Sequence, residues 1–216
     1  MKRRTIIILT TLLIAAGITM PTRAESIDSV FAAVPRAELP LLKLNARLDM
    51  LDLYNSGMAA MGENILGGSS EMVYKGKNLV RVKLTAASNW EMMRVQRGTE
   101  WAYVCIHTLS APLTESRLTL YSENWQSIDE EIMPVLTLKD FWQETDSLSD
   151  SRREELWRRL QPMRVEMSWN EEAEDTPPTL TLKLATGALG REDRELAEKY
   201  MRQLTLTWNG QALVRP

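Results

Sequence analysis

Apolar and polar residues alternate with a period of two through the middle of this chain, and short turn segments interrupt the alternation. The alternating segments are Leu79–Thr85, 90–96, Glu100–Leu109 and 117–122. Alternation of this kind is typical of strands with one buried face. Arg97-Gly98-Thr99 separates two of the segments, as in a hairpin with a glycine-containing turn. The pattern predicts an antiparallel meander of about four or five strands.

Helical periodicity appears on both sides of this meander. It predicts one strong helix within 41–58 before the meander, and helices at 151–160 and 190–203 after it. Strands are expected again at 163–169, 179–185 and 204–214, with Asn209-Gly210 as a hairpin turn in the last of these. The expected fold class is therefore α+β, with helices packed on antiparallel β-sheet meanders.

Two segments of the chain resemble each other. RLTLYSENWQSI begins at Arg117 and QLTLTWNGQALV begins at Gln203, and each has a Leu-Thr-Leu strand, a polar turn and a short return strand. This similarity suggests two helix-plus-meander repeats, at about 36–133 and 137–216. Leu-Thr-Leu is also common in strands by propensity alone. We therefore expect a single α+β domain over 25–216, and its division into these two repeats stays open.

The first 24 residues have the pattern of a secretory signal peptide. Lys2, Arg3 and Arg4 precede an uncharged apolar run from Thr5 to Met20, and Thr22-Arg23-Ala24 suits a cleavage site after Ala24. The run is shorter than the ~20 residues that span a bilayer. We expect an exported protein, periplasmic or extracellular, with no stable membrane anchor after cleavage.

The charges of the mature chain exclude one class of partner. Cleavage would remove four of the 26 basic residues and leave 22 against 29 acidic ones, a net charge of −7 with no basic block. Contacts with a phosphate backbone need clustered Lys and Arg. No nucleic-acid partner is expected. The four acids within the segment 170–178 are expected to belong to a solvated loop rather than a calcium site.

The chain has one Cys and one His, which limits its chemistry. One Cys makes no internal disulfide, and a zinc site needs three or four ligands. Cys105 and His107 are two residues apart in an expected strand, so their side chains would share a face. Because the surrounding run is apolar, we expect Cys105 to be buried and unreactive. The sequence indicates no cofactor, no metal and no catalytic motif.

A row of polar residues crosses the expected helix at 41–58. Asn45, Asp49 and Asp52 recur at spacings of four and three, between two groups of leucines. Partly buried carboxylates need hydrogen-bond donors or a basic partner. We therefore expect Asp49 and Asp52 to tie the helix to the sheet or a neighbouring loop, as a structural polar row rather than a catalytic or metal site.

Aromatic residues mark a candidate binding surface. Trp101, Tyr103 and Trp125 fall in or beside the expected strands, and Trp101 and Tyr103 share one strand face. Such a face suits a binding platform for sugars or peptides. It equally suits packing in a core, where most Trp side chains lie.

Several segments resemble, in order, a family of secreted Bacteroidales proteins that is catalogued only as a domain of unknown function. These segments are LPLLKLNARLDMLDLYNSGM, NILGGSSEM, VRVKLTAASNWEM, VCIHTL, SRLTLYSENW and, later, DFW with DSLSDSRREELWRRL. The resemblance covers most of the mature chain. It implies an exported protein and implies no activity, substrate or catalytic residue.

Two functions of different class follow from these features. The first is a non-catalytic binding or interaction module of the cell envelope, with an envelope protein or glycan as partner. The second is a carboxylate-based hydrolase that acts on an envelope glycan or peptide, because such enzymes need only a pair of acids. The poverty in His and Cys favours the first.

Overall fold

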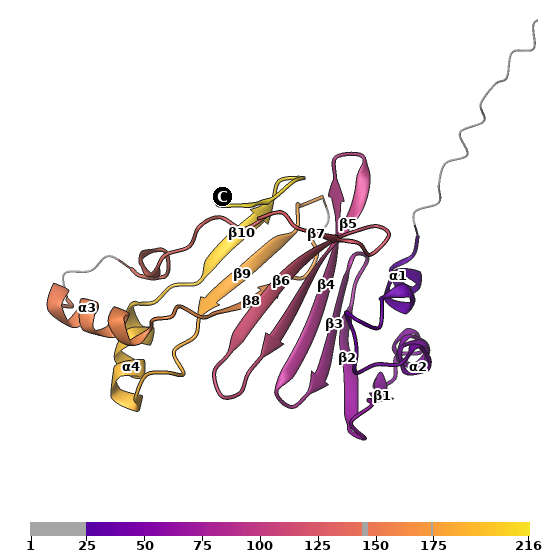
Figure 1. Ribbon diagram of the computed structural model, residues 1–216, viewed down its shortest axis with the longest axis horizontal. Helices are drawn as coiled ribbons and strands as arrows, with labels where there is room; N and C mark the ends of the chain where they lie inside the picture. Colours follow the sequence, from indigo (N-terminus) through magenta and orange to yellow (C-terminus); the bar gives the residue numbers. More distant parts are fainter. Residues whose placement is uncertain (1–24, 144–146, 174) are drawn as a thin grey trace, which may run out of the picture.

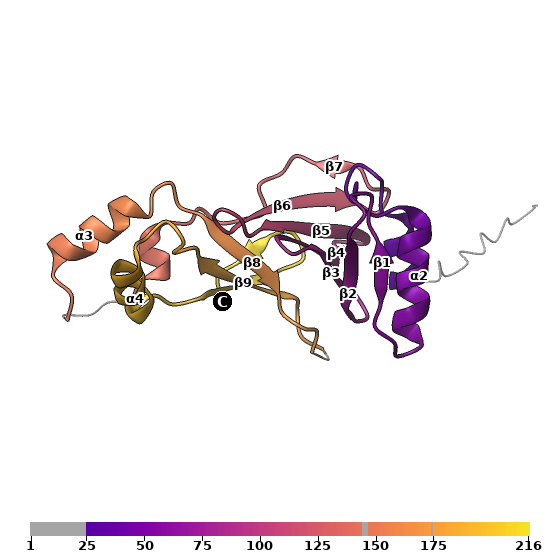
Figure 2. The same ribbon diagram turned by 90° about the horizontal axis from the view of Figure 1, so that it is seen from below.

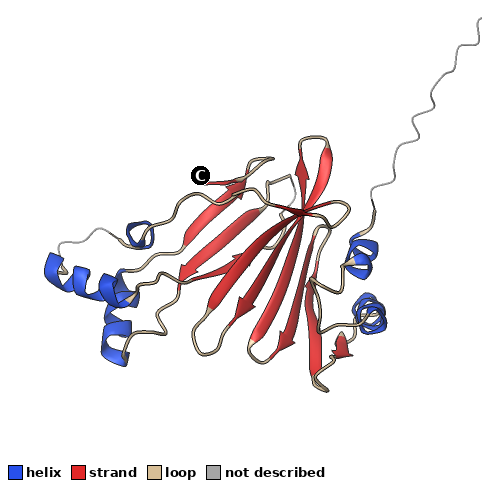
Figure 3. Ribbon diagram, in the orientation of Figure 1, coloured by secondary structure: helices blue, strands red, loops and turns tan. Residues whose placement is uncertain are grey.

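In the computed structural model of this protein, the described residues form two antiparallel sheets and four α-helices (Figure 1). The structure describes residues 25–143, 147–173 and 175–216. Strands dominate the centre of the molecule, and helices lie at its two ends (Figure 3). The expected α+β class with antiparallel sheets is confirmed. The expected signal peptide lies outside the described residues.

The larger sheet is a meander of seven strands in chain order. They are β1 (Met61–Glu63), β2 (Ser69–Lys75), β3 (Leu79–Thr85), β4 (Ser88–Arg97), β5 (Glu100–Leu109), β6 (Glu115–Ser122) and β7 (Ser127–Ile128). The alternating segments of the sequence correspond to β3 through β6. The sequence pattern did not predict β1 and β2, because the first is very short and the second is irregular at a bulge near Met72.

Helices α1 (Ile27–Ala33) and α2 (Leu44–Asn55) cover one face of this sheet. The Ser26 hydroxyl caps α1 by accepting a hydrogen bond from the Ser29 N–H at 3.2 Å. The core below the helices contains Phe31 and Trp90, whose rings lie 6.0 Å apart. This layer is held mainly by apolar burial.

The smaller sheet lies on the other face of the larger one. Its strands, in the order β11-β10-β9-β8, are β8 (Val165–Trp169), β9 (Thr179–Leu184), β10 (Leu204–Trp208) and β11 (Leu213–Val214). One core cluster runs through both sheets, and it includes Met93 and Val104 of the larger sheet with Trp169 and Leu206 of the smaller. The two sheets therefore share a hydrophobic core. The proposed duplication of the two halves stays a prediction.

Three helical segments lie at the far end of the smaller sheet, opposite α1 and α2 (Figure 2). They are the 3-10 helix η1 (Leu138–Phe141), α3 (Asp150–Arg159) and α4 (Arg191–Tyr200). Asp193 of α4 is buried and accepts hydrogen bonds from Arg152 and Arg159 of α3. The carboxylate of Asp193 thus lies between two guanidinium groups and joins α4 to α3. The exposed faces of both helices are highly charged.

Side chains of the larger sheet cover the outer edge of β8. The Met167 N–H donates to the Ser116 hydroxyl at 2.9 Å, and the Trp169 N–H donates to the buried carboxylate of Glu91 at 2.9 Å. Arg81 donates to the Trp169 carbonyl and, at 3.3 Å, to Glu91. These contacts satisfy backbone groups that an exposed edge strand would leave open to other chains.

Within the described residues, every helix is too short or too polar to cross a bilayer.

Candidate functional site: a polar groove between the two sheets

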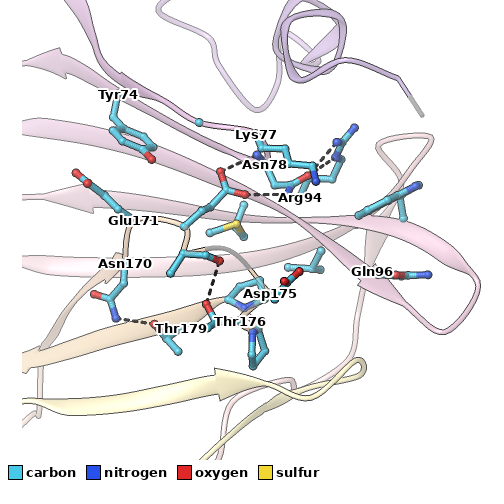
Figure 4. Close-up of a pocket in the computed structure, with 18 residues that line it drawn as sticks. Tyr74, Lys77, Asn78, Arg94, Gln96, Asn170, Glu171, Asp175, Thr176 and Thr179 are labelled. Carbon is cyan, nitrogen blue, oxygen red and sulfur yellow. Dashed lines mark hydrogen bonds between the residues drawn. The ribbon is translucent and has the colours of Figure 1, made fainter. Parts of the chain in front are cut away.

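A groove of about 790 Å³ lies where the two sheets diverge. Its walls come mainly from the β2–β3 turn, the end of β4 and the connection between β8 and β9, and Tyr74 of β2 and Trp101 of β5 add to them. Figure 4 shows Asn78 and Arg94 on one side, Asn170 and Thr179 on the other, and Asp175 between them. Polar side chains thus face the groove from both sheets.

The groove exists because the β4–β5 hairpin extends beyond β3. The pairing of β3 with β4 ends at Leu79 and Met93, whereas β4 remains paired with β5 up to Arg97 and Glu100. One further backbone bond runs from the Arg94 N–H to the Asn78 carbonyl at 2.7 Å. The chain before Asn78 turns away from β4, and this leaves the edge of β4 facing the groove.

Glu172 joins the two walls. Its carboxylate accepts one hydrogen bond from the Asn78 backbone N–H and one from the Asn78 side-chain amide, each at 2.8 Å. The same carboxylate lies against Gly76, where any side chain would collide with it. The glycine therefore allows the β8–β9 connection to dock on the β2–β3 turn.

Arg94 is held by contacts within the protein. Its guanidinium donates to the Asn78 side-chain oxygen at 3.0 and 2.9 Å and also to the Glu25 carbonyl. It lies 4.7 Å from the centroid of the Trp101 ring, a cation–π contact. These contacts order the groove wall, and they occupy one face of Trp101.

The accessible charges of the groove are mostly negative. Glu171 is 68% exposed and lies 3.7 Å from Arg81. Asp175 and Lys77 are also exposed. Burial, followed by the negative charges of Glu171 and Glu172, raises the pKa of Tyr74. Among the described residues, no group of three or more His, Cys, Asp or Glu side chains is placed to hold a metal ion.

The three aromatic residues of the expected binding surface do not form one surface. Tyr103 is only 3% exposed and stacks on Trp125, with ring centroids 4.5 Å apart. Tyr121 also contacts Trp125, at 5.7 Å. Trp101 instead lines the groove beside Arg94. Of the two interpretations that the sequence left open, packing in the core is the one that holds for Tyr103, because Trp125 covers its ring.

The polar row on α2 also has a different environment from the expected one. Asn45, Asp49 and Asp52 are all exposed, so the expectation of partial burial is wrong. The buried polar residue of this helix is Arg47, which donates to the Phe31 carbonyl at 3.1 Å and the Val34 carbonyl at 2.5 Å. α2 is rotated relative to the expected orientation because α1 packs beside it. The C-terminal end of α1 provides the two carbonyl groups that accept hydrogen bonds from Arg47.

A second polar cluster lies on the face of the sheet below α1 and α2. Glu38 is 7% exposed and accepts from the Trp90 indole N–H at 2.9 Å and the Tyr121 hydroxyl at 2.5 Å. The His107 Nε2 lies 2.9 Å from the same carboxylate. Glu38 thus fastens the segment between α1 and α2 to three strands.

Cys105 lies beside Glu38 and is fully buried. Burial, followed by the negative charge of Glu38, raises the pKa of the thiol well above its ordinary value. His107 shares the face with Cys105, as expected, but its Nε2 contacts Glu38. A thiolate nucleophile needs a lowered pKa, and this environment acts in the opposite direction.

Comparison with known proteins places the chain in a family. A family model described as "Protein of unknown function (DUF3256)" matches residues 19–213. The chain belongs to the DUF3256 family. The match spans both sheets and agrees with the expected membership of a family of unknown function. No curated protein matches the chain.

One solved structure shows the same fold as this DUF3256 member. It is a domain of an uncharacterized protein from Porphyromonas gingivalis W83, a member of the Bacteroidales. It shares 20% identity and a TM-score of 0.69, over 88% of this chain and 97% of that chain. At this identity the likeness concerns the fold alone.

The sequence pattern did not predict the residues that build the groove. Glu172 belongs to the acidic segment that was expected to be a solvated loop, and Glu171 and Asp175 in that loop are indeed exposed. Asn78 and Arg94 had no distinguishing pattern. The one local signal is the Gly76-Lys77-Asn78 turn before β3, because a glycine there permits close approach of another segment.

Proposed function

We propose that this protein is an exported, non-catalytic binding protein of the cell envelope and that the groove between the two sheets holds its ligand. The observation that carries this proposal is the groove itself, an open space of about 790 Å³ whose walls are held together by the Glu172–Asn78 contact. A site that is already formed before binding costs little ordering free energy when a ligand enters.

The residues around the groove favour binding over catalysis. Both oxygens of Glu172 already accept hydrogen bonds from Asn78. The sole His and the sole Cys of the chain belong to the cluster around Glu38. Asparagine, threonine and glutamine side chains supply many of the other polar groups of the groove, and these recognise ligands without transferring protons.

A carboxylate-based hydrolase remains a second candidate because Glu171 and Asp175 both lie in the groove. A hydrolase of this class needs one carboxyl group that donates a proton and one that stays ionised. Incubation of the mature protein with purified envelope glycan and with envelope peptide would test it. Product release that disappears in both Glu171→Gln and Asp175→Asn would favour the enzyme and contradict our proposal.

The export component of the proposal has its own test. The tripartite pattern of residues 1–24 supports cleavage after Ala24. N-terminal sequencing of the protein from the envelope or the medium should read Glu25-Ser26-Ile27. A mature protein that retains Met1 in the membrane fraction would contradict export as a cleaved protein.

Affinity capture tests the groove as the ligand site. The mature protein is immobilised and exposed to envelope extract, beside a variant with Glu171→Lys and Asp175→Lys. A matched control carries Glu123→Lys and Glu154→Lys, which change the net charge equally at exposed positions that do not line the groove.

We expect the same ligand to be captured by wild type and by the control, and lost by the groove variant. Capture that is equal in all three proteins would place the ligand elsewhere and overturn the proposal.

A further inference from the structure

We infer that the groove binds an extended, basic polypeptide segment that adds as a strand to the edge of β4 at Arg94–Gln96. The inference rests on the proposed ligand site and names the class of ligand: a peptide recognised through its backbone, rather than a glycan.

The backbone of β4 presents hydrogen-bonding groups to the groove. The Arg94 N–H points away from β5, since it donates to the Asn78 carbonyl at 2.7 Å. In an antiparallel pair, the N–H and C=O of one residue point to the same side, and so do those of the residue two positions along. The Arg94 carbonyl and the Gln96 N–H therefore also face the side on which β3 has ended.

Neither group receives the partner that a continued β3 would provide. A regular ladder would direct the Asn78 N–H to the Arg94 carbonyl, but that N–H donates to Glu172 at 2.8 Å instead. The chain turns at Gly76, whose N–H donates to the Leu79 carbonyl at 2.8 Å. The position opposite Gln96 is therefore not filled by β2 or β3.

The two groups have the spacing that a parallel strand requires. In a parallel ladder, one residue donates its N–H to the carbonyl of residue i−1 and accepts from the N–H of residue i+1. With Val95 as residue i, these groups are the Arg94 carbonyl and the Gln96 N–H. The Gln96 carbonyl already accepts a hydrogen bond from the Trp208 indole N–H at 2.9 Å, and this contact holds the backbone of β4 in place at Gln96.

The edges of β8 and β4 differ in how far other parts of the protein cover their backbone groups. Side chains of Ser116 and Glu91 cover the backbone donors of β8. On the edge of β4, Trp208 binds the Gln96 carbonyl, and Arg94, Val95 and Gln96 line the open volume of the groove. Proteins that do not use an exposed edge generally cover it, and strand addition is a common use of an edge that stays open.

Charge selects the type of peptide. Arg94 and Glu172 are engaged by protein partners. Among the described residues that line the groove, Glu171, Asp175 and Lys77 are exposed, and Glu171 stays 68% exposed although it lies 3.7 Å from Arg81. Two acids against one base favour a segment with Lys or Arg. The β8–β9 connection would face the side chains of the added strand while β4 binds its backbone.

A peptide selection tests the inference on the whole mature protein. A displayed library of random decapeptides is selected against the wild type, and the affinity of the strongest binders is measured by calorimetry. The Gln96→Pro variant removes the N–H that faces the groove, and Pro is compatible with an edge position. The Val135→Pro variant makes the same change at an exposed residue that does not line the groove.

We expect the selected peptides to be enriched in Lys and Arg and to bind wild type and Val135→Pro equally. Gln96→Pro should weaken binding by about tenfold, because a lost hydrogen bond of roughly 1.4 kcal/mol corresponds to that factor. Equal binding to Gln96→Pro, or a library that yields no binder to wild type, would overturn the inference.

A second measurement does not depend on how Gln96→Pro folds. Methylation of the peptide's backbone nitrogens, one at a time, should abolish binding at the residue that donates to Arg94 and leave binding intact at its neighbours in sequence. Indifference to methylation at every position would overturn strand addition.

The outcomes also separate this inference from the proposed function. An envelope ligand that is lost in the Glu171→Lys, Asp175→Lys variant but retained by a folded Gln96→Pro protein would leave the groove as the ligand site and eliminate strand addition. A ligand that is retained by both variants would eliminate both ideas.

Discussion

Asn78 and Glu172 are 94 residues apart in the chain and are joined by two hydrogen bonds of 2.8 Å. One bond uses the backbone N–H of Asn78 and the other its side-chain amide. The acceptor is a carboxylate, and hydrogen bonds to charged groups are stronger than those between neutral ones. This contact fastens the β8–β9 connection to the β2–β3 turn and so defines the width of the groove.

Substitution of Asn78 by Ala should loosen this connection without unfolding the sheets. The side-chain bonds to Glu172 and Arg94 are lost while the backbone bond remains, so we expect the free energy of unfolding to fall by about 1–2 kcal/mol. Hydrogen exchange should accelerate at residues 170–178 and stay unchanged in β5. Lys77→Ala, at the exposed neighbouring position, is the control. Unchanged exchange in this segment would show that the contact does not hold the loop.

The carboxylate of Glu38 should make stability depend on acid pH. Burial raises its pKa, but hydrogen bonds from His107, Tyr121 and Trp90, together with the charge of His107, outweigh burial and hold the pKa below its ordinary value of 4.5. A carboxyl group whose pKa is lower in the folded state binds its proton more readily when unfolded. Its stabilising contribution is therefore present above pH 4.5 and is lost as the pH falls through the lower folded value.

Denaturant unfolding at a series of pH values from 7 down to about 3 checks this prediction. Wild type should lose more unfolding free energy across the acid range than Glu38→Gln, which has no charge to lose. Glu38→Gln should itself be less stable than wild type at pH 7, because one amide cannot accept from all three donors. Parallel pH profiles for the two proteins would contradict the role of Glu38.

Arg47 and Asp49 should differ in their effect on stability. Arg47→Ala removes the donors to two buried carbonyl groups and should lower the free energy of unfolding by about 2–4 kcal/mol. Asp49→Ala and Asp52→Ala change exposed side chains and should stay within ~0.5 kcal/mol of wild type. Thermal melting of the three variants decides between this arrangement and a buried polar row. A large fall in the free energy of unfolding in either Asp variant would instead support the expectation that these residues connect α2 to the sheet.

The thiol of Cys105 should react slowly in the folded protein. It is buried, and both burial and the charge of Glu38 raise its pKa, so little thiolate forms at neutral pH. A thiol reagent should label native protein far more slowly than protein unfolded in urea. A Cys105→Ala, Ser110→Cys variant, with its thiol at an exposed position, should label fast in the native state and serves as the positive control. Fast labelling of native wild type would indicate an accessible thiol.

Local pattern alone was sufficient for most of the elements. The alternation in Leu79–Thr85 and Glu100–Leu109 corresponds to β3 and β5, and the charged segment after Ser149 corresponds to α3. Such patterns depend on which face of an element is buried, and this is a property of neighbouring residues. The α+β class followed from the order of these segments.

Only the tertiary structure decided which side of α2 is buried and where the groove lies. The apolar residues of α2 are spread around its whole circumference, so its sequence is compatible with several orientations. Leu44 and Leu48 are in fact exposed. Contact with α1 selected the orientation that buries Arg47. Likewise, Trp101 and Tyr103 share a strand face, but Trp125 covers only Tyr103.

The sequence by itself determined most of the elements, their order and the scarcity of His and Cys, because these depend on residue identity and local spacing. The tertiary structure alone decided that Asn78 meets Glu172 and that the edge of β4 stays open. These features depend on contacts between residues far apart in the chain. Such contacts produce no periodic pattern in the sequences of the segments that make them. The physical reason is that a hydrogen bond requires only a donor and an acceptor at the right distance, and many residues offer both.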